Sequence, residues 1–245
     1  MNEPTLSECL RARRSVRHFT DDKVPAETIR ELIEFASWAP SGGNDQPWEV
    51  TAVSPSRARS IRETYERRGW RALAPKMAMV VEQIEGCRKS AEEAVPRVLS
   101  KIDTEGISRG TPWLLLIHQR PAKVDEARVA EFHGVLRSRF SDIDVPTLSE
   151  MTEMCGAVNE EVGFASVMCF VYAFALAAES RGLASCIQHS WLVFREEIAR
   201  SLAPLGGGAA PIRSALLVGV PDRVSAANVK AANDASRRTV NVLFR

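Results

Sequence analysis

One apolar segment, residues 162–178, constrains the fold of this chain more than any other feature. Nearly every residue between Val162 and Ala178 is apolar, and the interruptions are the small residues Gly163 and Ser166. Its seventeen residues lie at the lower limit for a membrane span, and glutamates flank it in place of the commoner lysines and arginines. We therefore predict a helix that is buried on all sides in a globular core, and no association with a membrane.

The overall composition is that of an ordinary globular protein. The chain has 245 residues, of which 45% are apolar and 26% are charged, and its net charge is +1. This length is enough for one domain with a substantial core. Because a nearly neutral chain has no long-range field to attract a polyanion, we expect no nucleic-acid partner.

The cysteines and the N-terminus favour a cytoplasmic protein. The five cysteines are odd in number and widely spaced, without a CxxC pair, so free thiols in a reducing compartment are expected. The first fourteen residues, MNEPTLSECLRARR, lack the apolar run of a signal peptide. The four histidines show no HExxH or paired ligand spacing, so we predict no metal site.

Helices and strands alternate along the chain without a linker or an internal repeat. Strands are expected where short apolar runs lie between turn residues, and helices where apolar residues recur at helical spacing. Pro96 is expected to break any element around it. The predicted helices cover residues 6–14, 27–38, 55–69, 125–140, a long apolar segment ending at 181–182, and 195–202. The predicted strands cover residues 48–53, 77–81, 113–118, 184–189 and 214–220. This order predicts an α+β or α/β domain with one sheet covered by helices.

The common catalytic motifs are absent from the sequence. It has no GxSxG, no P-loop and no GxGxxG between a strand and a helix, which argues against a serine hydrolase and a Rossmann dehydrogenase. The triple glycine at 206–208 lacks the Lys-Ser/Thr of a phosphate loop and is interpreted as an ordinary loop.

Two arginine clusters are candidates for binding a phosphate. The first holds Arg11, Arg13, Arg14 and Arg17 with Ser15 among them, and the second is Arg237–Arg238. The planar guanidinium fork suits phosphate better than an ammonium does. Taken alone, either cluster is also compatible with a solvated run of charge.

A polar loop at residues 39–48, APSGGNDQPW, joins a predicted helix to a predicted strand. Its two glycines allow the backbone to approach a flat ligand closely. Ser41, Asn44 and Gln46 add hydrogen-bonding groups, and Pro47 stiffens the exit. A plain turn seldom needs so many hydrogen-bonding side chains between two prolines, so we interpret the loop as a binding loop.

These features together resemble the FMN-dependent nitroreductase superfamily. The matching motifs are RRSVRHF at 13–19, VP at 24–25, APSGGNDQPW at 39–48, LAAESRGLASC at 176–186, ALLVGVP at 215–221 and SRRTV at 236–240. They cover the first fifty residues and the last eighty, whereas residues 55–160 match poorly. The core helix departs from the family pattern, with Tyr172-Ala173 in place of a common Gln-Asn, and Ala235 replaces a frequent basic residue.

The resemblance implies an FMN site built from four segments. The N-terminal arginine segment would hold the phosphate and ribityl chain together with the C-terminal arginines. The loop at 40–46 would contact the flavin, in the family often from the partner subunit, and residues 188–190 would lie beside its ring. The implied cofactor-binding residues are Arg13, Arg14, Ser15, Arg17, Pro40, Ser41, Gly42, Asn44, Gln46, Gln188, His189, Ser190, Arg237 and Arg238.

The implied fold is a three-layer α/β/α form of the α+β class, with a central, mainly antiparallel sheet and a long buried core helix. Residues 1–245 would form one FMN-binding domain with a variable lid and substrate region at about 65–150, and the chain would form a homodimer. The implied function is reduction of a small electron-poor acceptor, such as a nitroaromatic or a quinone, by NADPH or NADH through a ping-pong hydride mechanism, with no side chain assigned as acid or base. The alternatives on the same fold are a biosynthetic dehydrogenase, a dehalogenase and a flavin-consuming enzyme. A further alternative is a non-catalytic flavin-binding protein.

Overall fold

A computed structural model describes residues 4–75, 91–103, 107–121, 123–140, 143–203 and 210–233 of the chain. The predicted strand at 77–81, the loop at 206–208 and the C-terminal arginines at 237–238 lie outside these residues. The helices are α1 (Leu6–Ala12), α2 (Ala26–Ala36), η1 (Gly42–Asn44), α3 (Pro55–Ala72), α5 (Ala91–Lys101), α6 (Glu126–Arg139), α7 (Leu148–Ser180), η3 (His189–Phe194), α8 (Arg195–Leu202) and α9 (Ala226–Asn233). The strands are β1 (Trp48–Val53), β2 (Trp113–Gln119), β3 (Ala184–Ile187) and β4 (Ile212–Gly219).

The four strands form one antiparallel sheet in the order β1-β2-β4-β3. The apolar runs in β2 and β4 occupy its centre, and their backbones are paired on both sides. Such continuous apolar strands are stable only if both faces of the sheet are covered. The prediction of a mainly antiparallel central sheet is confirmed.

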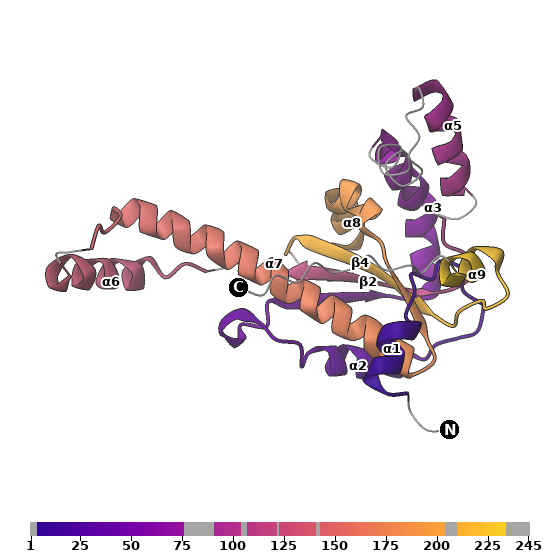
Figure 1. Ribbon diagram of the computed structural model, residues 1–245, viewed down its shortest axis with the longest axis horizontal. Helices are drawn as coiled ribbons and strands as arrows, with labels where there is room; N and C mark the ends of the chain where they lie inside the picture. The colour runs from indigo at the N-terminus through magenta and orange to yellow at the C-terminus, as the bar shows by residue number, and fades with distance from the viewer. Residues whose placement is uncertain are drawn as a thin grey trace, which may run out of the picture.

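Helices cover both faces of the sheet and produce three layers (Figure 1). Because side chains alternate along a strand, Leu114 and Leu116 of β2 pack toward α3, η3 and α8. Leu115 and Ile117 pack on the other face, toward α2 and α7. The α/β/α arrangement predicted from the sequence is therefore confirmed.

Helix α7 is the long core helix. It begins after Thr147, which forms a capping box with Glu150, and ends before Gly182, whose φ of +72° suits glycine. Phe170 and Phe174 are buried in the core. Helix α7 is long and apolar enough to cross a membrane, but half of its most apolar stretch is buried inside the chain.

The prediction that residues 162–178 are buried on all sides is wrong for the chain by itself. Val162, Phe164 and Tyr172 on α7 are 41%, 44% and 43% exposed. The described elements cover the side of α7 that faces the sheet and α2, and these three apolar side chains lie outside that contact. The helix therefore has one core face and one apolar face open to a partner.

The N-terminal half of α7 extends beyond the sheet, and α6 lies alongside it (Figure 1). Helix α6 lies where a helix was predicted at 125–140, and it buries none of its residues. The central strand β2 also falls inside the 65–150 region, so only the rest of that region is available for a lid. The assignment of a lid and substrate region stays a prediction.

Helix α5 corrects the expectation that Pro96 breaks its surroundings, because the helix continues through it. Proline removes one N–H from the helix ladder, and the residue four positions earlier, Glu92, is exposed, so its carbonyl is accessible to solvent. Val98 of α5 packs in a small cluster with Trp70 of α3. This packing holds α5 beside α3 (Figure 1).

Candidate functional site

The N-terminal arginine segment is fixed along the free edge of the sheet. Ser15 forms a parallel bridge with Ser185 of the edge strand β3, and the Val16 N–H donates to the Ser185 carbonyl at 3.1 Å. Farther along, the Phe19 N–H donates to the Arg109 carbonyl at 3.1 Å. Within the described residues, the segment thus covers the outer edge of β3 at Ser185, and its arginines flank this contact.

Arg13, Arg14 and Arg17 of this segment have different surroundings. Arg14 donates to the carbonyls of Arg11 and Arg13, at 2.5 and 2.8 Å, and so closes the end of α1. The Arg13 guanidinium carbon lies 5.8 Å from the Tyr172 ring centroid, and that of Arg17 lies 5.9 Å from the Trp70 ring centroid. Within the described residues neither Arg13 nor Arg17 forms an ion pair, so both retain charge for an anion.

Residues 188–190 leave β3 and turn into η3 close to this segment. The Gln188 N–H donates to the Ala215 carbonyl at 2.7 Å, which continues the pairing with β4. His189 Nε2 lies 3.2 Å from Ser214 Oγ, and burial lowers the pKa of His189. The backbone here is therefore fixed from the sheet side.

Helix α3 forms a wall of the same site, which the sequence did not predict. Gly69 packs so closely on η3 that an added Cβ would come within 2.4 Å of the Ser190 carbonyl oxygen. Trp70 follows it and lies beneath the Arg17 guanidinium. One turn earlier, the buried Glu66 accepts a hydrogen bond from Gln188 Nε2 at 3.2 Å. The spacing of buried Arg62, Glu66 and Gly69 marks one helix face, but it does not name the element on which that face packs.

Several buried polar atoms converge here without a hydrogen-bond partner in the described part of the chain. They include Arg17 Nε, Trp70 Nε1 and Ser190 Oγ. Leaving a buried polar atom unpaired costs about 1–3 kcal/mol. Arg17 lies over the Trp70 ring, and Gly69, next to Trp70, packs on Ser190, so a polar ligand bound at this wall of α3 could complete their hydrogen bonds.

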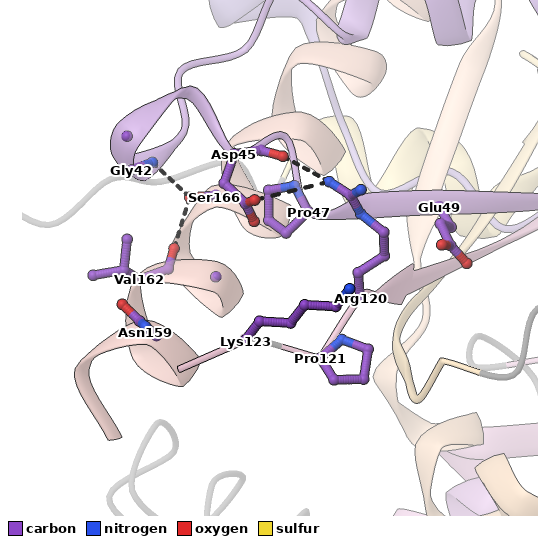
Figure 2. Close-up of a pocket in the computed structure, with 12 residues that line it drawn as sticks. Gly42, Asp45, Pro47, Glu49, Arg120, Pro121, Lys123, Asn159, Val162 and Ser166 are labelled. Atoms are coloured by element: carbon purple, nitrogen blue, oxygen red, sulfur yellow. Dashed lines mark hydrogen bonds and ion pairs between the residues drawn. The ribbon is translucent and has the colours of Figure 1, made fainter. Parts of the chain in front are cut away.

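The loop at 39–48 lies against α7 (Figure 2). The Gly42 N–H donates to Ser166 Oγ at 3.2 Å. Arg120, just after β2, donates to the carbonyls of Asp45 and Gln46 at 2.7 and 3.0 Å. The loop is therefore held from two sides.

Part of this loop has a strained backbone. Asn44 and Gln46 have φ angles of +58° and +47°, a region that costs most side chains roughly 1–2 kcal/mol. Gln46 Nε2 donates to Asn44 Oδ1 at 3.1 Å, and the Gln46 N–H donates to Ser41 Oγ at 3.0 Å. These bonds stabilise an exposed arrangement of polar groups, as a binding loop requires.

A cavity of about 710 Å³ adjoins the loop (Figure 2). Its walls come from the loop, from the segment after β2 and from α7. Six of the lining residues are Gly42, Gly43, Arg120, Lys123, Val162 and Ser166. Its volume is in the range of small-molecule sites, about 300–1,000 Å³.

The residues predicted from the sequence therefore fall into two groups within one chain. The 13–17 segment and residues 188–190 come together at β3 and α3. The loop contacts α7 at Ser166, about 9 Å along the helix axis from Tyr172, given the helical rise, where Arg13 lies. Arg237 and Arg238 lie outside the described residues.

The fold and these two groups of residues define an α+β protein of the nitroreductase type. The family model described as "Nitroreductase family" matches residues 10–219. The chain belongs to this family.

Individual relatives agree with the family assignment. Nitroreductase NfnB of Mycolicibacterium smegmatis is 51% identical over 45 residues, which are 18% of this chain and 19% of that protein. Chloronitrobenzene nitroreductase of Comamonas testosteroni is 26% identical over 191 residues, 77% of this chain and 75% of that protein. The first of these matches thus spans only about a fifth of the relative's length.

Solved structures show the same fold. The FMN and NADPH-dependent nitroreductase NfnB from Sphigopyxis sp. strain HMH superimposes with a TM-score of 0.53 at 20% sequence identity. The match covers 98% of this chain and 96% of that one. At this identity the likeness establishes the fold.

Proposed function

We propose that this protein binds FMN and uses NADPH or NADH to reduce a small electron-poor acceptor, such as a nitroaromatic or a quinone. The observation that carries the proposal is that Arg17 and Ser190, at two positions that the family resemblance assigns to the cofactor, each hold a buried polar atom without a hydrogen-bond partner in the described part of the chain. The relatives named above include a chloronitrobenzene nitroreductase and an FMN and NADPH-dependent nitroreductase.

The residues suit FMN in charge and in hydrogen-bonding groups. Arg13 and Arg17 would hold the phosphate and the polar chain through charge-assisted hydrogen bonds. Ser190 Oγ and the backbone of 188–190 would lie beside the ring, supported by Gly69 of α3. FMN supplies the hydride chemistry when it is bound, and the protein contributes binding, orientation and electrostatics.

The proposed site has one place for both the donor and the acceptor. The sequence contains no dinucleotide fingerprint for a separate nucleotide site. The two substrates would therefore occupy the same cleft in turn, which gives ping-pong kinetics. No side chain is assigned as an acid or a base.

A homodimer would bring the two groups of site residues together. The exposed apolar face of α7 includes Phe164 and Tyr172, and Tyr172 lies beneath Arg13 of the cofactor group. Apolar patches of this kind mark association surfaces. The loop at 40–46 of one subunit would then lie at the flavin of the other, with the cavity beside it available to the substrate.

Anaerobic reduction tests this proposal. Purified protein loaded with FMN is titrated with NADPH and with NADH, and turnover is then measured with a nitroaromatic and with a quinone at several fixed concentrations. The proposal expects bleaching of the flavin by at least one nicotinamide and parallel double-reciprocal lines. Intersecting lines would contradict a shared cleft, and a flavin that neither nicotinamide reduces would contradict the proposed oxidoreductase.

A further inference from the structure

Glu66 on α3 is the least exposed carboxylate in the described part of the chain, with 1% of its surface accessible. Moving a charged carboxylate out of water is costly unless hydrogen bonds and nearby charges compensate. A residue that served only to pack α3 against the sheet would be better as an apolar side chain. The surroundings of Glu66 therefore need an explanation.

Three donors converge on this carboxylate. Ser108 contributes its N–H to Oε1 at 3.0 Å and its hydroxyl to Oε2 at 2.7 Å. Gln188 Nε2 donates to Oε1 at 3.2 Å. Through these bonds Glu66 connects the 107–110 segment to the first residue of the 188–190 segment.

Arg62 is the nearest buried cation on the same helix, but it does not form an ion pair with Glu66 within the described residues. Its guanidinium donates to Ser108 Oγ at 3.2 Å and to the Gly110 carbonyl at 2.8 Å. Burial raises the pKa of Glu66, and Ser108, Arg62 and Arg17 oppose that rise. The carboxylate is thus held by donors and is influenced by the same Arg17 that faces the proposed cofactor site.

We propose that Glu66 is a positioning residue of the flavin site, which fixes Gln188–Ser190 through the Gln188 side chain and places a negative charge behind them. The inference rests on the proposed function, because it assigns this segment to the flavin. Gly69, one turn farther along α3, sets the separation between the helix and Ser190. The helix therefore controls both the placement and the electrostatics of the segment.

The negative charge of Glu66 would change how readily the bound flavin is reduced, which packing alone would not do. Reduction places additional negative charge on the flavin, and a fixed carboxylate nearby disfavours it. Glu66→Gln removes the charge and keeps nearly the same shape. We expect the ratio of affinities for reduced and oxidised FMN to rise about tenfold, equivalent to about 30 mV for a two-electron couple.

The experiment compares the midpoint potential and the oxidised-FMN affinity of wild type, Glu66→Gln, Glu66→Asp and Glu63→Gln. Glu63 lies on the exposed side of the same helix and is the matched control. We expect the midpoint potential of bound FMN to rise in Glu66→Gln and to stay near the wild-type value in Glu63→Gln. In Glu66→Asp it should return toward the wild-type value. Equal potentials in wild type and Glu66→Gln, both with FMN bound, would overturn it.

Failure of wild type to bind FMN and failure of Glu66→Gln to fold have different meanings. Wild-type protein that does not bind FMN would remove the proposed function itself. If Glu66→Gln does not fold, Gln188→Met removes the bond to Glu66 and leaves the carboxylate in place. FMN binding at least threefold weaker than wild type would then support the positioning role, and unchanged binding would overturn it.

Discussion

Arg13 and Arg17 are the residues from which cofactor affinity should chiefly come. Each lies over an aromatic ring and forms no ion pair with the described residues. Because a hydrogen bond to a charged group contributes about 1.5–3 kcal/mol, we expect Arg13→Ala and Arg17→Ala each to weaken FMN binding by about that amount. Arg11→Ala is the control, since this arginine is exposed on α1. Fluorescence titration gives the three affinities, and equal values would show that the phosphate site lies elsewhere.

Glu66 gives a residue-scale prediction on the pH dependence of stability. Burial raises its pKa in the folded state, whereas a glutamate in the unfolded chain titrates near about 4.3. At a pH between the pKa of the unfolded chain and the raised pKa of the folded state, the folded state binds more protons than the unfolded state. The stability of the folded state therefore falls as the pH rises through this range. Urea unfolding of wild type and Glu66→Gln should show the variant gaining relative stability as the pH rises above about 4.3. A stability difference between wild type and Glu66→Gln that does not change with pH would contradict the raised pKa of Glu66.

At the scale of elements, the contact of α3 with η3 governs the site. Gly69→Ala would place a Cβ within 2.4 Å of the Ser190 carbonyl oxygen, so the helix must shift, at a cost of about 1–3 kcal/mol. We expect weaker FMN binding together with this loss. In Gly134→Ala, on α6, the added Cβ meets no atom within 4 Å. This variant should raise the free energy of unfolding by about 0.5–1 kcal/mol. Thermal unfolding and FMN titration of both variants test the contrast, and unchanged FMN affinity in Gly69→Ala would argue against α3 as a wall of the site.

The sequence predicted elements best where one local pattern was sufficient. The helix at Arg195–Leu202 and the strand at Trp48–Val53 have the predicted bounds. Periodicity could not fix the start of the long apolar helix to the residue, because a loop was expected at 141–150, whereas α7 begins at Leu148. It also could not show that Pro96 is tolerated inside α5.

The candidate site was predictable to a similar degree. The motifs located the arginine segment and residues 188–190, and the structure places them together. Glu66 and Gly69 were missed because their role depends on which element α3 packs against, and that contact arises from the tertiary fold. Arginine clusters and polar loops are visible in a sequence, whereas a buried carboxylate looks like any other helical glutamate.

The whole molecule is expected to be a homodimer, since α7 exposes an apolar face that a second copy would cover. Phe164 is 44% exposed in the single chain. We expect Phe164→Asp to dissociate the dimer and lower FMN occupancy, because a charge would be buried at the interface. Val224→Asp is the control, at an apolar side chain that is 89% exposed and outside α7. Sedimentation velocity at micromolar concentration measures both variants, and a monomeric wild type with full FMN occupancy would contradict the prediction.

The central claim is that the site formed by the 13–17 segment, residues 188–190 and α3 binds FMN. Titration of flavin-free protein with FMN and, separately, with FAD tests it most directly, with binding followed by calorimetry and flavin fluorescence. The account predicts saturable binding of one FMN per chain and much weaker binding of FAD, since the sequence lacks a dinucleotide fingerprint. Absence of FMN binding, or equal affinity for FAD, would contradict it.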